Sequence, residues 1–291
     1  MKNRFAQFAV AACLVAGASL APAVHASPVV YSNLAVNGLM AAASRPGTGS
    51  FEIETADDFI LTQTTRIDHA TFIGLLPTGA SLASITQVRL EIYRVFPNDS
   101  NPGRTPTVPT RVNSPSDVAF ADRDSAASEL SFSVALQNGS FTASNSIAPG
   151  GIHASPNQRT GGNGAVTGEE VQFDVDLLTP FLLPADHYFF IPQVQLSDGT
   201  FYWLSASRPI VGGTPFLPDL QAWTRDAALD PDWLRIGTDI VGGQVPPTFN
   251  MAFALNGTVV GAQVPEPATV ALFGLGLLAA FAARGRRTRP G

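Results

Sequence analysis

The chain is poor in cysteine and in charge. Its 291 residues contain a single cysteine, Cys13, and charged residues make up only 14% of the sequence, well below the roughly 25% of an average soluble domain. Because Cys13 lies in the N-terminal apolar segment, the remaining chain has no thiol, which excludes a disulfide framework or a thiolate zinc site there. The 26 glycines and 23 prolines are fewer than the roughly 25–30% of residues typical of disordered chains.

The charges are distributed unevenly. Residues 27–263 contain no lysine, 11 arginines and 22 of the 23 carboxylates, which gives this part a net charge of about −11. So acidic a surface repels phosphate backbones. Nucleic acid is therefore not an expected partner.

The first 26 residues have the pattern of a secretory leader. A basic start with Lys2 and Arg4 precedes an uncharged, mostly apolar run over residues 5–20. Small residues then occupy the two positions that a leader peptidase reads before Ser27. We interpret residues 1–26 as a signal peptide cleaved between Ala26 and Ser27, with residues 21–23 as an alternative cleavage sequence.

The last 28 residues fall into three parts. Pro265-Glu266-Pro267 favours an extended backbone, because each proline restricts its own φ and the residue before it. The uncharged run 268–283 would form a helix about 24 Å long, short for a hydrocarbon core of about 30 Å. The basic end is formed by Arg284, Arg286, Arg287 and Arg289. These arginines mark the cytoplasmic side, so the preceding domain faces outward.

In this order the three parts resemble the PEP-CTERM sorting signal of Gram-negative bacteria. The resemblance covers residues 264–291 and implies recognition by an exosortase, a membrane-embedded cysteine-dependent transpeptidase-like enzyme, in a host that makes extracellular polysaccharide. It implies recognition of Pro265-Glu266-Pro267 and membrane retention through the helix and the arginines. The protein would then pass the inner membrane transiently and reach the outer surface or the extracellular matrix. Hydropathy alone supports a simple C-terminal anchor equally well.

Alternation of apolar and polar residues dominates residues 27–263 and is typical of half-buried strands. We expect strands over 58–61, 66–75, 88–93, 130–137, 171–177, 187–196, 200–205 and 249–256. Ser197-Asp198-Gly199 predicts a hairpin turn, residues 220–228 a short helical turn, and residues 97–115 and 149–168 surface loops. The predicted fold is all-β, an antiparallel β-sandwich of jelly-roll or immunoglobulin-like type, with a separate C-terminal transmembrane helix.

No catalytic or metal-binding motif occurs in residues 27–263. The histidines His69, His153 and His187 are far apart in sequence, and no His-Glu-x-x-His or Gly-x-Ser-x-Gly sequence accompanies them. We interpret His69 and His187 as structural residues of strands. Three acidic groups could supply oxygen ligands to calcium: Asp122 with Asp124, Asp230 with Asp232, and Glu52 with Asp58. None follows the calcium-loop pattern, so we favour solvated surface charge and expect no cofactor.

Aromatic residues give the main indication of a ligand. The three tryptophans are Trp203, Trp223 and Trp233, and the last follows Asp230-Pro231-Asp232 directly. Exposed rings beside carboxylates are how β-sandwich modules bind sugars, although large aromatic residues more often fill cores. We expect a non-enzymatic surface or matrix protein that interacts with extracellular polysaccharide. A secreted hydrolase, which two carboxylates facing each other in a deep cleft would favour, and a purely structural envelope protein are the alternatives.

Overall fold

The computed structural model describes residues 27–48, 51–100, 112–153, 159–207, 220–229 and 233–261. The predicted signal peptide, the sorting tail and the pair Asp230 and Asp232 lie outside these residues. Within them, no helix is long and apolar enough to cross a membrane. The predicted transmembrane helix over 268–283 falls outside the described ranges.

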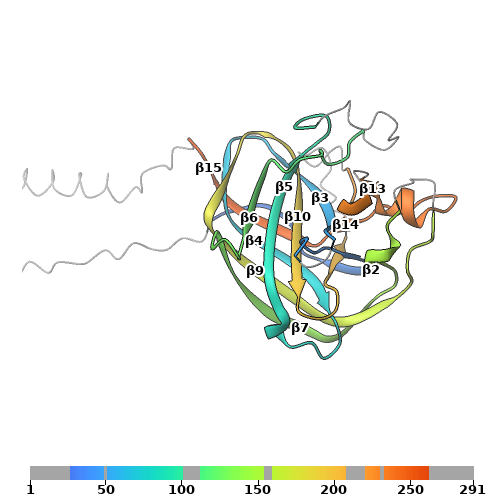
Figure 1. Cartoon of the computed structure of the whole chain (residues 1–291). Coiled ribbons are helices and arrows are strands. Elements are labelled where there is room, and N and C mark those ends of the chain that lie inside the picture. The colour runs from blue at the N-terminus through green and yellow to red at the C-terminus, as the bar shows by residue number, and fades with distance from the viewer. Residues whose placement is uncertain are drawn as a thin grey trace, which may run out of the picture.

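The described residues form two β-sheets (Figure 1). The larger sheet has nine strands: β1 (Val29–Asn33), β2 (Val36–Ala43), β4 (Thr65–Leu76), β7 (Leu130–Ala143), β8 (Ser146–Ile147), β9 (Val166–Leu183), β11 (Tyr202–Ala206), β14 (Asn250–Met251) and β15 (Phe253–Val259). Strand β4 is its centre. Along its length β4 pairs with β9, and it also pairs with β15 and β11, while β7 lies outside β9.

The smaller sheet has six strands in the order β13-β12-β3-β10-β5-β6. Their bounds are β3 (Ile53–Leu61), β5 (Ile85–Arg94), β6 (Ala121–Asp124), β10 (Asp186–Leu196), β12 (Trp223–Asp226) and β13 (Leu234–Arg235). Four short helical turns connect the strands: η1 (Leu82–Ser84), η2 (Pro149–Gly151), η3 (Ala227–Leu229) and η4 (Ile236–Val241). Among the described strands, β2 with β8 is the one parallel pair.

Aromatic side chains from both sheets meet in a shared core. Phe190 of β10 stacks on Phe253 of β15 with ring centroids 5.0 Å apart, and it meets Trp203 of β11 edge-on at 6.0 Å. Phe59 of β3 contacts Tyr31 of β1 at 6.4 Å. Such pairs add about 0.5–1.5 kcal/mol each beyond the area that they bury. The two sheets therefore pack face to face around one hydrophobic interior.

The predicted all-β architecture with two sheets is confirmed, and a jelly-roll or immunoglobulin-like strand order stays a prediction. One local prediction is wrong, and another is right only in part. The Asp198-Gly199 turn, where Gly199 has φ of +85°, does not close a hairpin, because β10 belongs to the smaller sheet and β11 to the larger. The helical turn predicted over 220–228 begins only at Ala227, with η3, because residues 223–226 form strand β12 and pair with β3 along its edge.

Candidate functional site

The three tryptophans do not form a sugar-binding surface. Trp203, Trp223 and Trp233 are 0%, 1% and 2% exposed. Their indole N–H groups donate to the backbone oxygens of Ala252, Leu220 and Ser116 respectively, at 2.9–3.0 Å. A ring with no exposed face cannot stack on a sugar, so the prediction that these residues bind one is wrong. They fill the interior, as bulky apolar side chains usually do.

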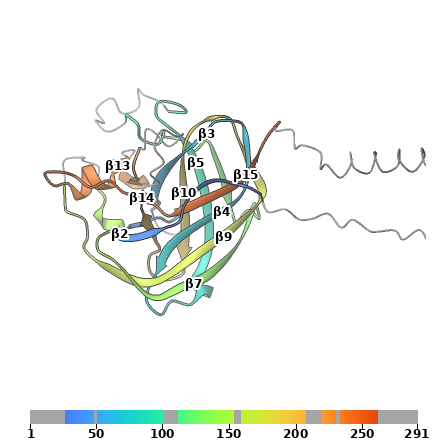
Figure 2. The ribbon, with the colours of Figure 1, turned by 180° about the vertical axis from the view of Figure 1, so that it is seen from behind.

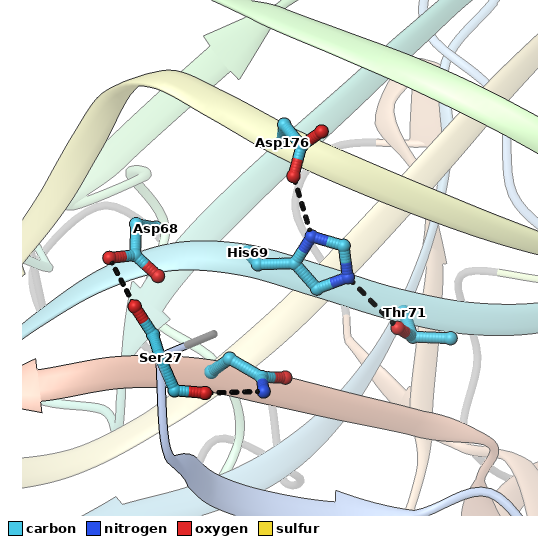
Figure 3. A pocket seen from close by; sticks show the side chains of 6 residues that line it. Ser27, Asp68, His69, Thr71 and Asp176 are labelled. Atoms are coloured by element: carbon cyan, nitrogen blue, oxygen red, sulfur yellow. Dashed lines mark hydrogen bonds and ion pairs between the residues drawn. The ribbon is translucent and has the colours of Figure 1, made fainter. Parts of the chain in front are cut away.

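An open polar pocket of about 520 Å³ lies on the outer face of the larger sheet (Figure 3). Strand alternation places His69, Thr71 and Asp176 there, because Ala70, Phe72 and Val175 of the same strands point into the core. Asp68 is adjacent to His69 and joins it in the pocket where the register of β4 shifts, between Ile67 and His69. The lining residues are Ser27, Asp68, His69, Thr71, Asp176 and Asn256. They come from β4, β9, β15 and Ser27, which lies two residues before β1, so the pocket combines segments distant in sequence. We call it the His69 pocket.

His69 is held by a carboxylate from the neighbouring strand. It lies opposite Asp176 in the β4–β9 register, and its Nδ1 is 2.8 Å from Asp176 Oδ1 (Figure 3). Its Nε2 is 3.4 Å from the Thr71 hydroxyl, whose own hydrogen is donated to Asp174 Oδ1 at 3.0 Å. Nε2 also lies 3.9 Å from Asp174 Oδ1. In the neutral tautomer that directs Nδ1–H at Asp176, Nε2 is a hydrogen-bond acceptor.

The opposite side of the pocket is formed by the start of the described chain. The Ser27 hydroxyl donates to Asp68 Oδ2 at 2.8 Å (Figure 3), and the Asn256 amide donates to the Ser27 carbonyl at 2.9 Å. The Asp68 carboxylate also accepts from Arg66 at 3.2 Å. The pocket thus presents carboxylate, amide, imidazole and hydroxyl groups, each oriented by a neighbour.

The Thr71 hydroxyl of the pocket is not placed for activation by His69. Thr71 stands on a regular strand and directs its hydrogen at Asp174, so His69 does not receive it as a general base would. Among the described residues no group of three or more His, Cys, Asp or Glu side chains could hold a metal ion. The groups present are those that exchange hydrogen bonds with hydroxyl-rich or amide-bearing ligands.

A second cluster of polar side chains is buried on the other face of the molecule. Glu54 of β3 lies opposite Arg225 of β12 and is 0% exposed. One carboxylate oxygen accepts from the Tyr93 hydroxyl at 2.6 Å, and the other accepts from Arg225 Nε. The guanidinium also lies 4.5 Å above the ring of Trp233. Both oxygens of this buried carboxylate are therefore satisfied, as a buried charge requires.

Electrostatics follow from this burial. Burial and the charge of Glu54 raise the pKa of the Tyr93 hydroxyl. Burial alone would lower the pKa of Arg225, but Glu54 and Tyr93 raise it overall. Glu91 of β5 is also buried, and burial, together with the charge of Glu54, raises its pKa well above the usual carboxyl range. Its Oε1 lies 2.8 Å from Arg89, whereas its Oε2 has no hydrogen-bond partner. We give the name Glu54 cluster to the side chains of Glu54, Arg225, Tyr93, Glu91 and Arg89.

The acidic residues considered for calcium have other partners. Asp122 pairs with Arg89 at 3.3 Å, and Asp124 accepts from Gln87 at 2.6 Å. Asp58 lies 2.7 Å from His187 Nε2, which agrees with a structural role for that histidine. Glu52 accepts from Gln193 at 2.9 Å. Each of these carboxylates thus forms a hydrogen bond or an ion pair with a residue of a neighbouring strand.

Sequence reasoning named His69 but missed the pocket around it. The available signal was the outward alternation of Asp174 and Asp176 in one predicted strand and of His69 and Thr71 in another. The register that joins the two strands was not readable from either sequence.

The described part of the chain is thus an all-β domain of two packed sheets with a polar pocket near its first residue. The segment that follows it identifies how the protein is handled: residues 263–287 match the family described as the PEP-CTERM protein-sorting motif. The resemblance of the tail to this signal is confirmed. The motif implies exosortase-dependent sorting during export, to the cell surface. No curated protein and no solved structure matches the chain significantly.

Proposed function

We propose that this is a non-enzymatic protein of the cell surface or extracellular matrix that binds extracellular polysaccharide through the His69 pocket. The observation that carries the proposal is the set of pre-oriented hydrogen-bonding groups at an open surface, in a chain that carries an export-sorting motif. Carboxylates accept pairs of hydroxyl hydrogens, and Asn256 and His69 add an amide and an acceptor nitrogen.

The charge of the pocket restricts the class of polysaccharide. Asp68, Asp174 and Asp176 lie at or beside the pocket, and residues 27–263 carry a net charge of about −11. A polymer with carboxylate or sulfate groups would be repelled by this surface. The expected ligand is a neutral polysaccharide, which offers hydroxyl groups and no charge.

Binding of the exported protein to immobilised glycans, with and without calcium, tests this proposal. Neutral polymers should bind and acidic ones should not, and Asp176→Asn should weaken binding at least tenfold. Asp198→Asn is the matched control, because Asp198 is an exposed carboxylate in a turn outside the pocket. Equal binding by wild type and Asp176→Asn would reject the pocket. Tryptophan fluorescence should stay unchanged on binding, since all three indoles are buried.

We propose roles in sorting for three sequence elements that lie outside the described residues. We propose that Pro265-Glu266-Pro267 is the recognition element, displayed as extended backbone with one negative charge. The segment 268–283 holds it at the inner membrane as a short helix, and the arginines from Arg284 to Arg289 keep the end in the cytoplasm. The protein is then transferred to the outer surface or matrix.

One observation favours a hydrolase as the second candidate function. Glu54 and Glu91 are buried acids in one cluster. Burial together with the charge of Glu54 raises the pKa of Glu91, and a carboxyl group with a raised pKa is typical of a general acid. Release of reducing sugar from polysaccharides by wild type, abolished in Glu91→Gln, would support this function. Absence of both binding and hydrolysis would leave a purely structural envelope protein.

A further inference from the structure

Strand β7 is an edge strand along most of its length. It is 14 residues long and pairs with β9 from Leu130 to Ala143. No other strand of the described ranges pairs with it, and its contact with β2 is confined to its end, where Ser144 N–H donates to the Gly38 carbonyl. Figure 2 shows β7 at the lower margin of the molecule, outside β9.

The first half of this edge, residues 130–136, lacks the features that usually protect an open strand. The register shifts that interrupt the β7–β9 pairing lie beyond it, between Leu136 and Asn138 and between Asn138 and Phe141. Natural edge strands carry lysines, prolines or inward charges that prevent another strand from pairing. Residues 130–143 contain no charged residue and no proline. The neutral stretch is unusual because it lies in a part of the chain with a net charge of about −11. Two such acidic domains repel each other except where a neutral strip meets a neutral strip.

The apolar face of β7 also ends abruptly. Phe132, Val134 and Leu136 lie opposite β9 residues whose side chains fill the core, such as Phe173. Phe132 and Val134 are half-buried, whereas Leu136 is 55% exposed. The core side chains therefore continue to the sheet edge and stop there, in contact with solvent.

We propose that β7 is an interface at which two copies of this protein pair, antiparallel, into one continuous sheet. A second copy of β7 fits this edge for two reasons. Neither strand carries a charge, and antiparallel pairing places the apolar faces of both strands on the same side of the joined sheet. A two-fold axis through Val134 would set Phe132 of one copy opposite Leu136 of the other and cover the exposed leucine. The nearest acidic strands, the two copies of β9, would be separated by both β7 strands.

Substitution to lysine on the outer face tests this interface without changing the core. Ser133 and Ala135 are exposed and lie opposite Asp174 and Gln172 of β9, so lysines there are tolerated within one copy and repel each other between two. Sedimentation equilibrium of the exported protein should show a reversible dimer at tens of micromolar. Ser133→Lys/Ala135→Lys should weaken dimerisation at least tenfold.

The matched control is Thr86→Lys/Thr258→Lys, which adds the same charge at two exposed positions of β5 and β15, strands that have partners on both edges. This control should dimerise like wild type once the small change in net charge is matched by salt. A wild type that stays monomeric at 100 micromolar, or a β7 variant that dimerises as tightly as the control, overturns the proposal.

Cross-linking gives a second readout. The predicted exported protein has no cysteine. A single cysteine is therefore introduced in turn at Ser131, Ser133, Val134 or Ala135, and a disulfide can form only with the same cysteine of a second copy. Mild oxidation should give a disulfide dimer for the residue nearest the two-fold axis. Thr258→Cys should remain monomeric. Absence of cross-linking along the whole of β7 would reject antiparallel pairing of this strand.

Discussion

Glu91 and Glu54 approach each other from two strands of the smaller sheet, and both are buried on its outer face. Burial together with the charge of Glu54 raises the pKa of Glu91 well above that of an ordinary glutamate. Both oxygens of Glu54 accept hydrogen bonds, one from Tyr93 and the other from Arg225. The Glu54 cluster therefore links the stability of the domain to pH.

Glu91→Gln should reduce the pH dependence of stability. A carboxyl whose pKa is raised by folding binds its proton more tightly in the folded state. Its contribution to stability is complete below the usual glutamate pKa of about 4.3 and is lost as the pH rises through the raised value. Wild type should therefore lose stability relative to Glu91→Gln over the pH range above about 4.3. Thermal unfolding of both proteins across this range measures the difference.

The control for this prediction is Asp198→Asn, which removes an exposed carboxylate and keeps a residue suited to its turn. Its melting temperature should follow wild type at every pH. Parallel pH curves for wild type and Glu91→Gln would show that Glu91 is ionised in both states of the protein.

Arg225→Met should destabilise the domain strongly. Removing one partner of a buried ion pair leaves an uncompensated charge, at about 3–5 kcal/mol. Arg66→Met is the matched control, since the Arg66 side chain is half-exposed in its pair with Asp68, and exposed pairs contribute about 0–1 kcal/mol. Denaturant unfolding measures both variants. If Arg225→Met itself does not fold, Glu54→Gln/Arg225→Met should recover a folded protein.

Glu266→Ala, or alanine at both Pro265 and Pro267, should leave export unchanged but trap a full-length, membrane-bound form. The reason is that the proposed recognition element is lost while the uncharged segment 268–283 and the arginines remain. Deletion of residues 268–291 should instead release the domain without membrane retention. Fractionation and immunoblotting in a host that has the sorting enzyme measure these forms. Processing of the Glu266 and double-proline variants like wild type would mean that the tail is only an anchor.

The exported protein should begin at Ser27. Cleavage after Ala26 would place a new amino group on a residue that already bonds Asp68 and Asn256. An ammonium group beside Asp68 should add a modest stabilisation, about 0.2–1 kcal/mol for a partly exposed pair. Intact mass measurement identifies the first residue, and Asp68→Asn should lose this increment. Intact Met1 in the surface fraction would contradict cleavage of the leader.

Alternation was sufficient to predict most long strands, because a half-buried strand records its own faces in its sequence. Leu130 to Gln137 and Val171 to Leu177 are examples, and both lie within long strands of the larger sheet. Strand β3 was predicted only in part, since nearly all of its residues are buried, including Glu54 and Asp57. A strand covered on both faces has no alternation to detect.

Pairing between distant strands was beyond sequence reasoning. The sequence allowed two roles for the tryptophans, sugar binding at the surface or packing in the core. Which role applies depends on which other residues cover the rings. Trp233 is covered by Arg225 of the nearby strand β12 and by Tyr93 of β5, which is far away in sequence. Likewise, His69 and Asp176 meet only because β4 and β9 pair in one register.

The position of β15 decides how the domain bears mechanical load. This last strand lies between β1 and β4, and its final residue, Val259, pairs with Thr65 at the start of β4. A pull along the axis of β15 shears the hydrogen bonds on both of its edges together rather than opening them one after another. Load that reaches the domain along this strand is therefore resisted by β1 and β4 at once, without unravelling the sheet from the Val259 end.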